Sequence, residues 1–275
     1  VELVDGLEGK LATAFSTPWG QMCYTRMPMG LTSSPGAFMM TVDAALRGLP
    51  PGIAVAYVDD ILVPTDGDWD DHMRDVGLVF SALIEAGFTV NPKKVFMGMR
   101  EVPYLGYIVG AFGTKPNPER TKAIFDMSFE QVRTDASAAA RFAGMISFYS
   151  RFLKNLHITL APFHALKAKH ADVPRILGSL KFKAAFELLR YQLADVTAIT
   201  RPDYTKDFHV VVDTASSVGV GATLMQLEDV EDPQSLRPVA FWSHRLNEQE
   251  KGWHVRDQEC YGLILALREW RSYVL

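Results

Sequence analysis

The stretch Tyr57-Val58-Asp59-Asp60 sets two acidic side chains between two short apolar runs, residues 53–56 and 61–63. β-Branched runs on either side of a short polar turn predict a buried β-hairpin with both carboxylates at its tip. Adjacent aspartates repel each other and lose hydration against an apolar sheet, and a bound cation offsets both costs. In phosphoryl transfer that cation is Mg²⁺, often as a pair. The alternative is a solvated polar turn, because so short a motif recurs by chance.

The composition of the chain is that of a globular protein. Its 275 residues are 48% hydrophobic and 22% charged, which suits roughly two domains with real cores. Two cysteines, Cys23 and Cys260, give no disulfide framework and no cysteine-based zinc spacing, as expected in a reducing compartment. No apolar run is as long as a membrane span, so we expect no membrane partner and an intracellular location, in the cytoplasm, a particle or the nucleus. The sequence predicts no oligomeric state.

Charge is distributed unevenly along the chain, although the formal net charge is only −4. Residues 56–75 hold seven Asp and one Arg, whereas residues 141–190 hold nine Lys or Arg and two acidic residues. An acidic cluster and a separate basic segment suit an enzyme that holds a polyanion near metal ions. A solvated basic helix face explains the same counts without a ligand.

Residues 1–113 predict an α+β layer built on an antiparallel sheet. Residues 17–20 indicate a hairpin turn, and Ser34-Pro35 starts a helix that ends at Gly48. A second helix runs from about Asp70 to Ala86, and residues 104–109 form a later strand. Residues 114–175 are predicted to form a second, helical domain. Three histidines in that domain lack partner carboxylates, which argues against a metal site; they are His157, His164 and His170.

Residues 176–275 predict a connecting helix and then an α/β arrangement. The helix covers 182–193, and strands at 208–212, 219–225 and 238–243 precede a long helix at 253–275. Asp213 follows the first strand, and the small residues after it leave its carboxylate open to a ligand.

Glu259 is predicted to lie on an apolar stripe of the long helix. The helical neighbours that define this stripe are Val255, Leu263, Ala266 and Trp270. If the stripe packs on the sheet that ends at Asp213, a lone buried carboxylate is costly, and a metal shared with Asp213 removes most of the cost. The alternative is that Glu259 lies at the margin of the stripe and pairs with Arg256 or with solvent.

Several motifs occur in a fixed order along the chain. They are residues 13–20, residues 26–31, Ser34-Pro35, Tyr57-Val58-Asp59-Asp60, residues 91–94, Tyr104-Leu105-Gly106, residues 148–152 and Asp213-Thr214-Ala215-Ser216. In this order they strongly resemble the reverse transcriptase of gypsy-type LTR retrotransposons, with a tethered RNase H, and the similarity covers essentially all of the chain. The resemblance implies a polymerase palm in 1–113, a helical thumb in 114–175, and in 176–275 a connection helix and the N-terminal part of an RNase H-like domain.

The resemblance also implies an activity and partners. The intact parent would be an RNA-directed DNA polymerase that adds dNTPs to the 3′-hydroxyl of a DNA primer on an RNA template. Its RNase H endonuclease would cut the RNA of RNA–DNA hybrids, and each active site would use two Mg²⁺ ions. Asp59 and Asp60 would bind the polymerase metals, and Asp213 and Glu259 would bind those of RNase H.

Further roles follow from the same resemblance. Lys94 would sit near the triphosphate, where a cation can neutralise charge or protonate the leaving pyrophosphate. Leu105, Gly106 and Tyr107 would belong to the primer grip. The residues of the nucleotide and template pocket would be Tyr57, Arg26, Pro28, Met29, Gly30, Ser34 and Pro35.

Departures from the family pattern leave alternatives open. The chain lacks an initiator methionine and stops at Leu275 inside a helical pattern, so we interpret it as an internal fragment of a Pol polyprotein. A third polymerase acid and the later RNase H acids would lie outside it, which predicts an inactive fragment. Met29 replaces a usual aromatic residue, and Met39 replaces a common Gln. The alternatives are an inactive nucleic-acid-binding remnant of a retroelement, or a Mg²⁺-dependent nuclease or phosphohydrolase of another lineage.

Overall fold

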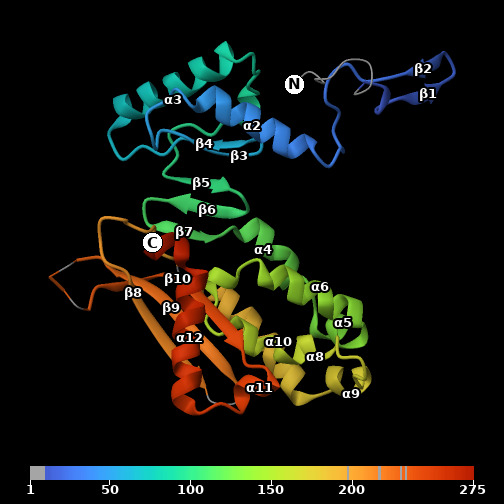
Figure 1. The fold of residues 1–275 in the computed structure, drawn as a ribbon, viewed down its shortest axis with the longest axis vertical. Coiled ribbons are helices and arrows are strands. Elements are labelled where there is room, and N and C mark those ends of the chain that lie inside the picture. Colours follow the sequence, from blue (N-terminus) through green and yellow to red (C-terminus); the bar gives the residue numbers. More distant parts are fainter. Residues whose placement is uncertain (1–9, 197, 216–217, 230, 233) are drawn as a thin grey trace. The chain divides into compact units, whose positions relative to one another are not determined.

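The computed structural model describes residues 10–275 except 197, 216–217, 230 and 233. Its backbone forms two compact units, Val1–Met99 and Arg100–Leu275, which are described separately below (Figure 1). Ser216, which belongs to one of the motifs above, lies outside the described residues. In the part of the chain that the structure describes, no helix is both long and apolar enough to cross a membrane.

Among its described residues the first unit contains two longer helices, a short 3₁₀ helix and two small antiparallel hairpins. Its elements are β1 (Phe15–Thr17), β2 (Gly20–Met22), α2 (Ser34–Leu46), β3 (Val55–Tyr57), β4 (Asp60–Leu62), α3 (Trp69–Glu85) and the 3₁₀ helix η1 (Pro92–Lys94). The predicted helices are confirmed. A capping box between Asp68 and Asp71 starts α3, and Gly87, at φ 79°, follows its last turn, because glycine adopts this left-handed conformation without strain.

The second unit begins with a three-stranded antiparallel sheet, β5 (Glu101–Tyr104), β6 (Tyr107–Gly110) and β7 (Gly113–Pro116). A helical region follows, as predicted for this part of the sequence. Its elements are α4 (Pro118–Phe125), α5 (Phe129–Thr134), α6 (Ala136–Ser147), η2 (Ser150–Phe152), α7 (Leu156–Thr159), α8 (Ala161–Ala165), α9 (Val173–Leu177) and α10 (Leu180–Ala194).

An aromatic core holds these helices together. Phe142, Phe182 and Phe186 are fully buried, and the ring centroids of Phe142 and Phe186 lie 4.7 Å apart. Each such side chain contributes about 1.5–3 kcal/mol by leaving water. Helix α10 contributes Phe182, Phe186 and Leu189 to this core, so it packs with the helices that precede it.

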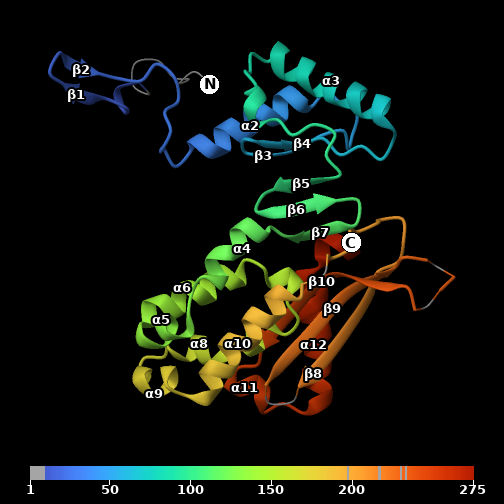
Figure 2. The same cartoon turned by 180° about the vertical axis from the view of Figure 1, so that it is seen from behind.

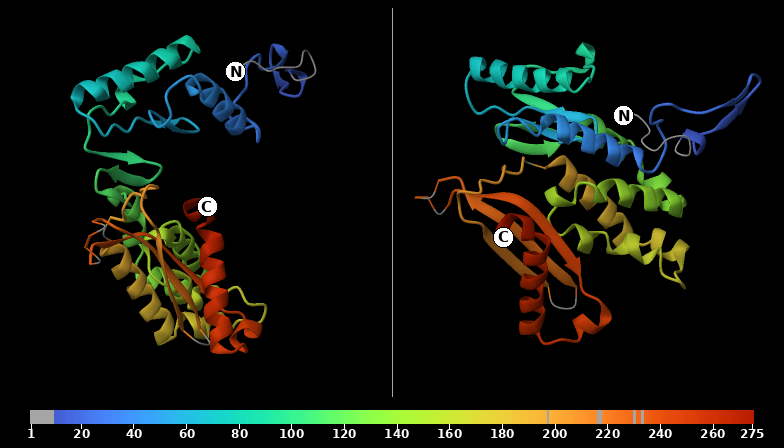
Figure 3. Two further views of the ribbon diagram at one scale, coloured as in Figure 1. Left: turned by 60° about the vertical axis from the view of Figure 1, so that its left-hand side comes forward. Right: turned by 45° about the horizontal axis from the view of Figure 1, so that its top comes forward.

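The chain ends in a second three-stranded antiparallel sheet with strand order β10-β9-β8. Its elements are β8 (His209–Ala215), β9 (Gly219–Leu227), β10 (Leu236–Arg245), α11 (Glu248–Lys251), α12 (Val255–Glu269) and α13 (Arg271–Val274). Helix α12 lies in front of the sheet in Figure 1 and behind it in Figure 2. The predicted helix over 253–275 is divided at Trp270, and α13 continues beyond that residue (Figure 3).

Candidate functional site

The acidic hairpin of the first unit has a two-residue turn. Tyr57 pairs with Asp60, so Val58 and Asp59 form the turn itself. Val58 has φ 53°, a left-handed conformation that costs a β-branched residue about 1–3 kcal/mol. Two-residue turns with positive φ match the twist of the flanking strands. The tight turn therefore holds Asp59 and Asp60 next to each other at the tip.

The hairpin is more exposed than predicted. Val55 is 48% exposed and Tyr57 is 56% exposed, and both aspartates are exposed. The prediction of a buried hairpin is wrong because β3 and β4 pair only with each other in the described sheet, and so narrow a ribbon covers little of its own surface.

The donor chemistry of this tip suits a hard divalent cation. Carboxylate oxygens are the ligands that Mg²⁺ prefers, and Asp59 and Asp60 supply up to four of them from adjacent positions. Within the described residues no group of three or more His, Cys, Asp or Glu side chains is placed to hold a metal ion. The hairpin thus fits a metal as part of a ligand set, not as a complete site.

The predicted nucleotide-pocket residues lie on the loop before α2 and at its start. Buried Ser34 donates a hydrogen bond from its hydroxyl to the Pro28 carbonyl at 2.9 Å, which ties the loop to the helix. Gly30, at φ 96°, gives the loop its sharp turn, and Met29 is fully exposed. Pro35 lies in the first turn of α2, and Arg26 is exposed.

Lys94 ends η1 and is exposed. The side chain of Asn91 accepts a hydrogen bond from the Lys93 backbone at 3.1 Å and so fixes this turn. The structure places these residues on separate elements of the first unit, and their roles at a nucleotide stay predictions.

In the second unit, the turn between β5 and β6 packs against the segment after α6. Leu105 and Gly106 form the turn with φ 50° and 86°. The Tyr107 ring lies parallel to Phe148, with centroids 5.2 Å apart and 7° between the planes. A Cβ atom on Gly106 would meet the Phe148 ring at 3.4 Å. The contact brings the two motifs together across 41 residues, where the Tyr107 hydroxyl donates to the Phe148 carbonyl at 3.4 Å.

Burial raises the pKa of the Tyr107 phenol, although Arg151 opposes the shift. Burial likewise raises the pKa of Tyr149, whose ring meets Tyr107 edge to face. Both phenols therefore stay protonated and available as donors. No spacing in the sequence predicts this contact; the aromatic residues of the two motifs are the only signal for it.

The metal site predicted between Asp213 and Glu259 is not formed, because the two side chains lie on different surfaces. Val212 packs toward α12, with its Cγ1 3.4 Å from the position of a Cβ on Gly262. Successive side chains of a strand point to opposite faces, so Asp213 points away from α12. Glu259 is exposed on that helix.

The predicted apolar stripe is confirmed only in its second half, where Ala266 and Trp270 are buried. The buried positions of α12 are Gln258, Gly262 and Ala266, while Val255 and Leu263 are 45% and 43% exposed. The prediction that Glu259 packs on the sheet is therefore wrong, and it lies at the margin, as in the alternative. The reason is a buried glutamine that hydropathy assigns to the surface.

Gln258 is 1% exposed and anchors the turn before α12. Its amide nitrogen donates to the carbonyls of Glu250, Lys251 and Trp253 at 3.0, 3.2 and 3.3 Å. These bonds satisfy the amide nitrogen, whereas the buried side-chain oxygen of Gln258 has no hydrogen-bond partner among the described residues. No pattern in the sequence identifies this residue, because its partners are backbone atoms.

Two family models match the chain. Residues 8–109 match the model described as reverse transcriptase (RNA-dependent DNA polymerase), and residues 181–275 match the RNase H-like domain found in reverse transcriptase.

Curated relatives are Pol polyproteins of transposons. The chain is 31% identical over 271 residues to the retrovirus-related Pol polyprotein from transposon opus of Drosophila melanogaster, with 95% of the chain and 26% of the relative covered. It is 30% identical over 272 residues to the one from transposon gypsy of the same organism, with 95% and 25% covered. The chain thus spans about a quarter of the length of these relatives.

Solved structures share the fold. The foamy viral protease-reverse transcriptase dRH in complex with double-stranded DNA has a TM-score of 0.81 at 21% identity, and the match covers 100% of this chain and 47% of that one. The foamy viral protease-reverse transcriptase in complex with an RNA/DNA hybrid has a TM-score of 0.78 at 20% identity, and the match covers 100% and 36%.

Proposed function

We propose that this chain, which belongs to the reverse transcriptases of LTR-retrotransposon Pol polyproteins, carries the palm and thumb of an RNA-directed DNA polymerase and part of an RNase H-like domain. Its substrates would be a dNTP and a DNA primer paired to an RNA template. Reverse transcriptases use divalent metal ions in general, and we propose that the ion here is Mg²⁺, two per active site.

The observation that carries this proposal is the two-residue turn at Val58 and Asp59. It places Asp59 in the turn and Asp60 at the first position of β4, so both carboxylates lie at the tip of the hairpin. When bound there, Mg²⁺ would align the primer 3′-hydroxyl with the dNTP α-phosphate and stabilise the charge that develops. Tyr57, directly paired with Asp60, would flank the primer end.

The remaining site residues would act by position and charge. The loop tied down by Ser34, with Arg26, Pro28, Met29, Gly30 and Pro35, would shape the pocket of the incoming nucleotide. Lys94 would meet the triphosphate as a cation. The turn at Leu105 and Gly106, held by Tyr107 on Phe148, would support the primer strand.

Nucleic acid would track the basic segment of the second unit. Residues 141–190 hold nine Lys or Arg against two acidic residues, and phosphate binding by such a segment releases counterions. Binding of an RNA–DNA hybrid should therefore weaken steeply as salt rises. An RNase H activity on that hybrid is a separate proposal with its own test; because Asp213 and Glu259 lie on different surfaces, they would contribute to it without sharing one metal ion.

Primer extension tests the polymerase proposal. A polypeptide that carries these 275 residues with their natural flanking sequence is given an RNA template, a DNA primer, dNTPs and Mg²⁺. We expect Asp59→Asn to lower extension at least about a hundredfold, while the matched exposed variant Asp195→Asn keeps it. Extension that survives Asp59→Asn, or none at all beside a working control polymerase, contradicts the proposal. Hybrid cleavage measured on Asp213→Asn tests the RNase H part independently.

A further inference from the structure

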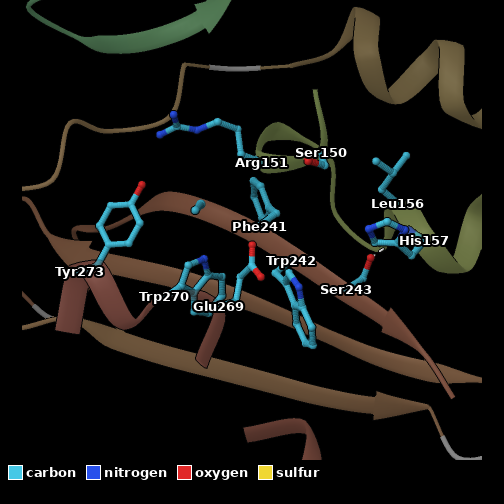
Figure 4. A pocket seen from close by; sticks show the side chains of 11 residues that line it. Ser150, Arg151, Leu156, His157, Phe241, Trp242, Ser243, Glu269, Trp270 and Tyr273 are labelled. Carbon is cyan, nitrogen blue, oxygen red and sulfur yellow. Dashed lines mark hydrogen bonds between the residues drawn. The ribbon is translucent and has the colours of Figure 1, made fainter. Parts of the chain in front are cut away.

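A pocket of about 320 Å³ lies in the second unit, at the junction of the helical region and the last sheet (Figure 4). One wall comes from η2 and the start of α7, the second from β10, and the third from the end of α12 and from α13. Its lining includes Arg151, His157, Phe241, Trp242, Glu269 and Tyr273. Apart from Arg151, which belongs to the basic segment 141–190, these residues have no role in the proposed polymerization or hybrid cleavage.

The pocket combines flat aromatic walls with two opposite charges. Figure 4 shows the Glu269 carboxylate directed toward Phe241, between Trp242 and Trp270 in that view. The Arg151 side chain extends toward the end of the pocket that Tyr273 lines (Figure 4). Among the described residues neither charged group is held in a salt bridge, and the Arg151 guanidinium lies over the Phe152 ring, 5.7 Å from its centroid, which leaves its charge unneutralised for a ligand.

His157 adds a neutral polar group at the other end. Burial lowers its pKa, and nearby His244 acts in the same direction, while Glu269 opposes the shift. Its backbone nitrogen is already bound to Ser243, which fixes the wall. The charged groups of the pocket are thus one guanidinium, toward the Tyr273 end, and one carboxylate, near its middle.

These groups select among ligands. An alkyl ammonium or guanidinium ion would meet Glu269 but would be repelled by Arg151. A planar base can stack on the aromatic walls, and an anionic phosphate can pair with Arg151. The edge of guanine offers two N–H donors to one carboxylate, whereas adenine, cytosine and uracil offer one donor group there. The volume lies at the small end of the range for ligand sites and suits a mononucleotide.

We propose that this pocket binds a guanine nucleotide, with the base on the aromatic walls, its N–H edge on Glu269 and its phosphate on Arg151. The same chemistry could come from free guanosine monophosphate or from one guanine of a single-stranded RNA.

Binding without Mg²⁺ or primer separates this proposal from the polymerase proposal. The full chain is titrated with GMP and CMP by calorimetry, and with short single strands of G-containing and C-only RNA. We expect GMP to bind about tenfold more tightly than CMP. Glu269→Gln should remove this preference. Arg151→Met should weaken the binding of GMP but not that of guanosine, titrated in the same way. The matched variants Glu85→Gln and Arg47→Met, at exposed positions outside both the pocket and the basic segment, should behave as the parent does.

Each outcome decides the proposal. Tighter binding of GMP than of CMP identifies the free nucleotide as the ligand. A preference for G-containing RNA without one for GMP identifies the RNA strand. Either result supports the proposal if Glu269→Gln abolishes the preference. Equal binding of GMP and CMP, no binding of either form, or a preference that Glu269→Gln leaves intact overturns it. Circular dichroism of each variant excludes loss of folding as the cause.

Discussion

The backbone N–H of His157 donates to the Ser243 hydroxyl at 2.9 Å, across 86 residues of sequence. This bond joins the start of α7 to β10, and Asn155 and Ile158 lie directly over Gly221 and Gly219 on the same side of the sheet. The close approach favours glycine, because a Cβ at Gly219 would collide with the His244 backbone carbonyl and one at Gly221 would displace the Asn155 side chain. The helical region and the last sheet therefore share one interface.

Ser243→Ala should destabilise this interface. Ser243 is buried, so the substitution leaves the His157 N–H without its partner and should lower the free energy of unfolding by about 1–3 kcal/mol. Urea denaturation followed by tryptophan fluorescence measures the change. Ser137→Ala, at an exposed helix position, serves as the control and should change stability by less than about 0.5 kcal/mol. Equal effects of the two substitutions would show that the bond contributes nothing.

The interface should weaken in mild acid. Burial lowers the pKa of His157 and of His164, and neighbouring positive groups act in the same direction: His244 at His157, and His157, Lys167 and Arg245 at His164, while Glu269 opposes the shift at His157. Below the ordinary histidine pKa of about 6.5 the unfolded chain binds protons that the folded chain rejects. This contribution is therefore complete above about pH 6.5 and is lost as the pH falls toward the lowered values.

Thermal unfolding at pH 7.5 and 5.5 measures this effect. The parent should lose more Tm between the two values than a His157→Gln, His164→Gln double variant, because carboxylate titration is common to both. An identical loss in the two proteins would exclude the histidines as its source.

Phe148→Ala should loosen the turn at Leu105 and Gly106. The parallel stack of Phe148 on Tyr107 contributes about 0.5–1.5 kcal/mol beyond its buried area. In primer extension the variant should raise the KM for primer–template more than it lowers kcat, since the turn is proposed to support the primer. Tyr191→Ala removes an exposed aromatic residue of α10 and is the control. A fall in kcat alone would argue against a role in primer binding.

Gln258→Ala should be among the most destabilising single changes in the last domain. It removes the donor to three carbonyls and leaves a gap beneath the turn before α12, at a cost of about 2–4 kcal/mol. Gln249→Ala, on exposed α11, should cost little. Chemical denaturation of both variants provides the comparison, and a neutral Gln258→Ala would show that solvent replaces these bonds.

Local pattern predicts much of the fold but not its long-range contacts. The helices over residues 34–46 and 70–85 and the three final strands follow from capping residues and from periodicity, which are local properties. The burial of Gln258 does not, because its partners are backbone carbonyls that carry no side-chain signal. The predicted stripe of α12 placed Glu259 on the sheet, whereas the neighbouring Gln258 is the buried residue. Neighbouring helical positions differ by about 100°, so an error of one residue exchanges the buried and the exposed side.

In the candidate site, too, the local features are predicted from the sequence and the long-range contacts are not. The motif around Asp59 predicts the hairpin and the acids at its tip, because both strands and the turn lie within eight residues. The contact of Tyr107 with Phe148 depends on how a sheet and a helix meet, and no spacing rule specifies it. The exposure of the hairpin follows from its narrow sheet rather than from its apolar composition.

Cation binding at Asp59 and Asp60 is the claim on which the account depends, and Mn²⁺ titration monitored by electron paramagnetic resonance tests it most directly. Mn²⁺ shares the oxygen preference of Mg²⁺ and is spectroscopically visible. We predict that the chain binds Mn²⁺, that Mg²⁺ displaces it, and that an Asp59→Asn, Asp60→Asn double variant loses the site while Asp195→Asn retains it. Equal Mn²⁺ binding by the parent and the double variant would contradict the account.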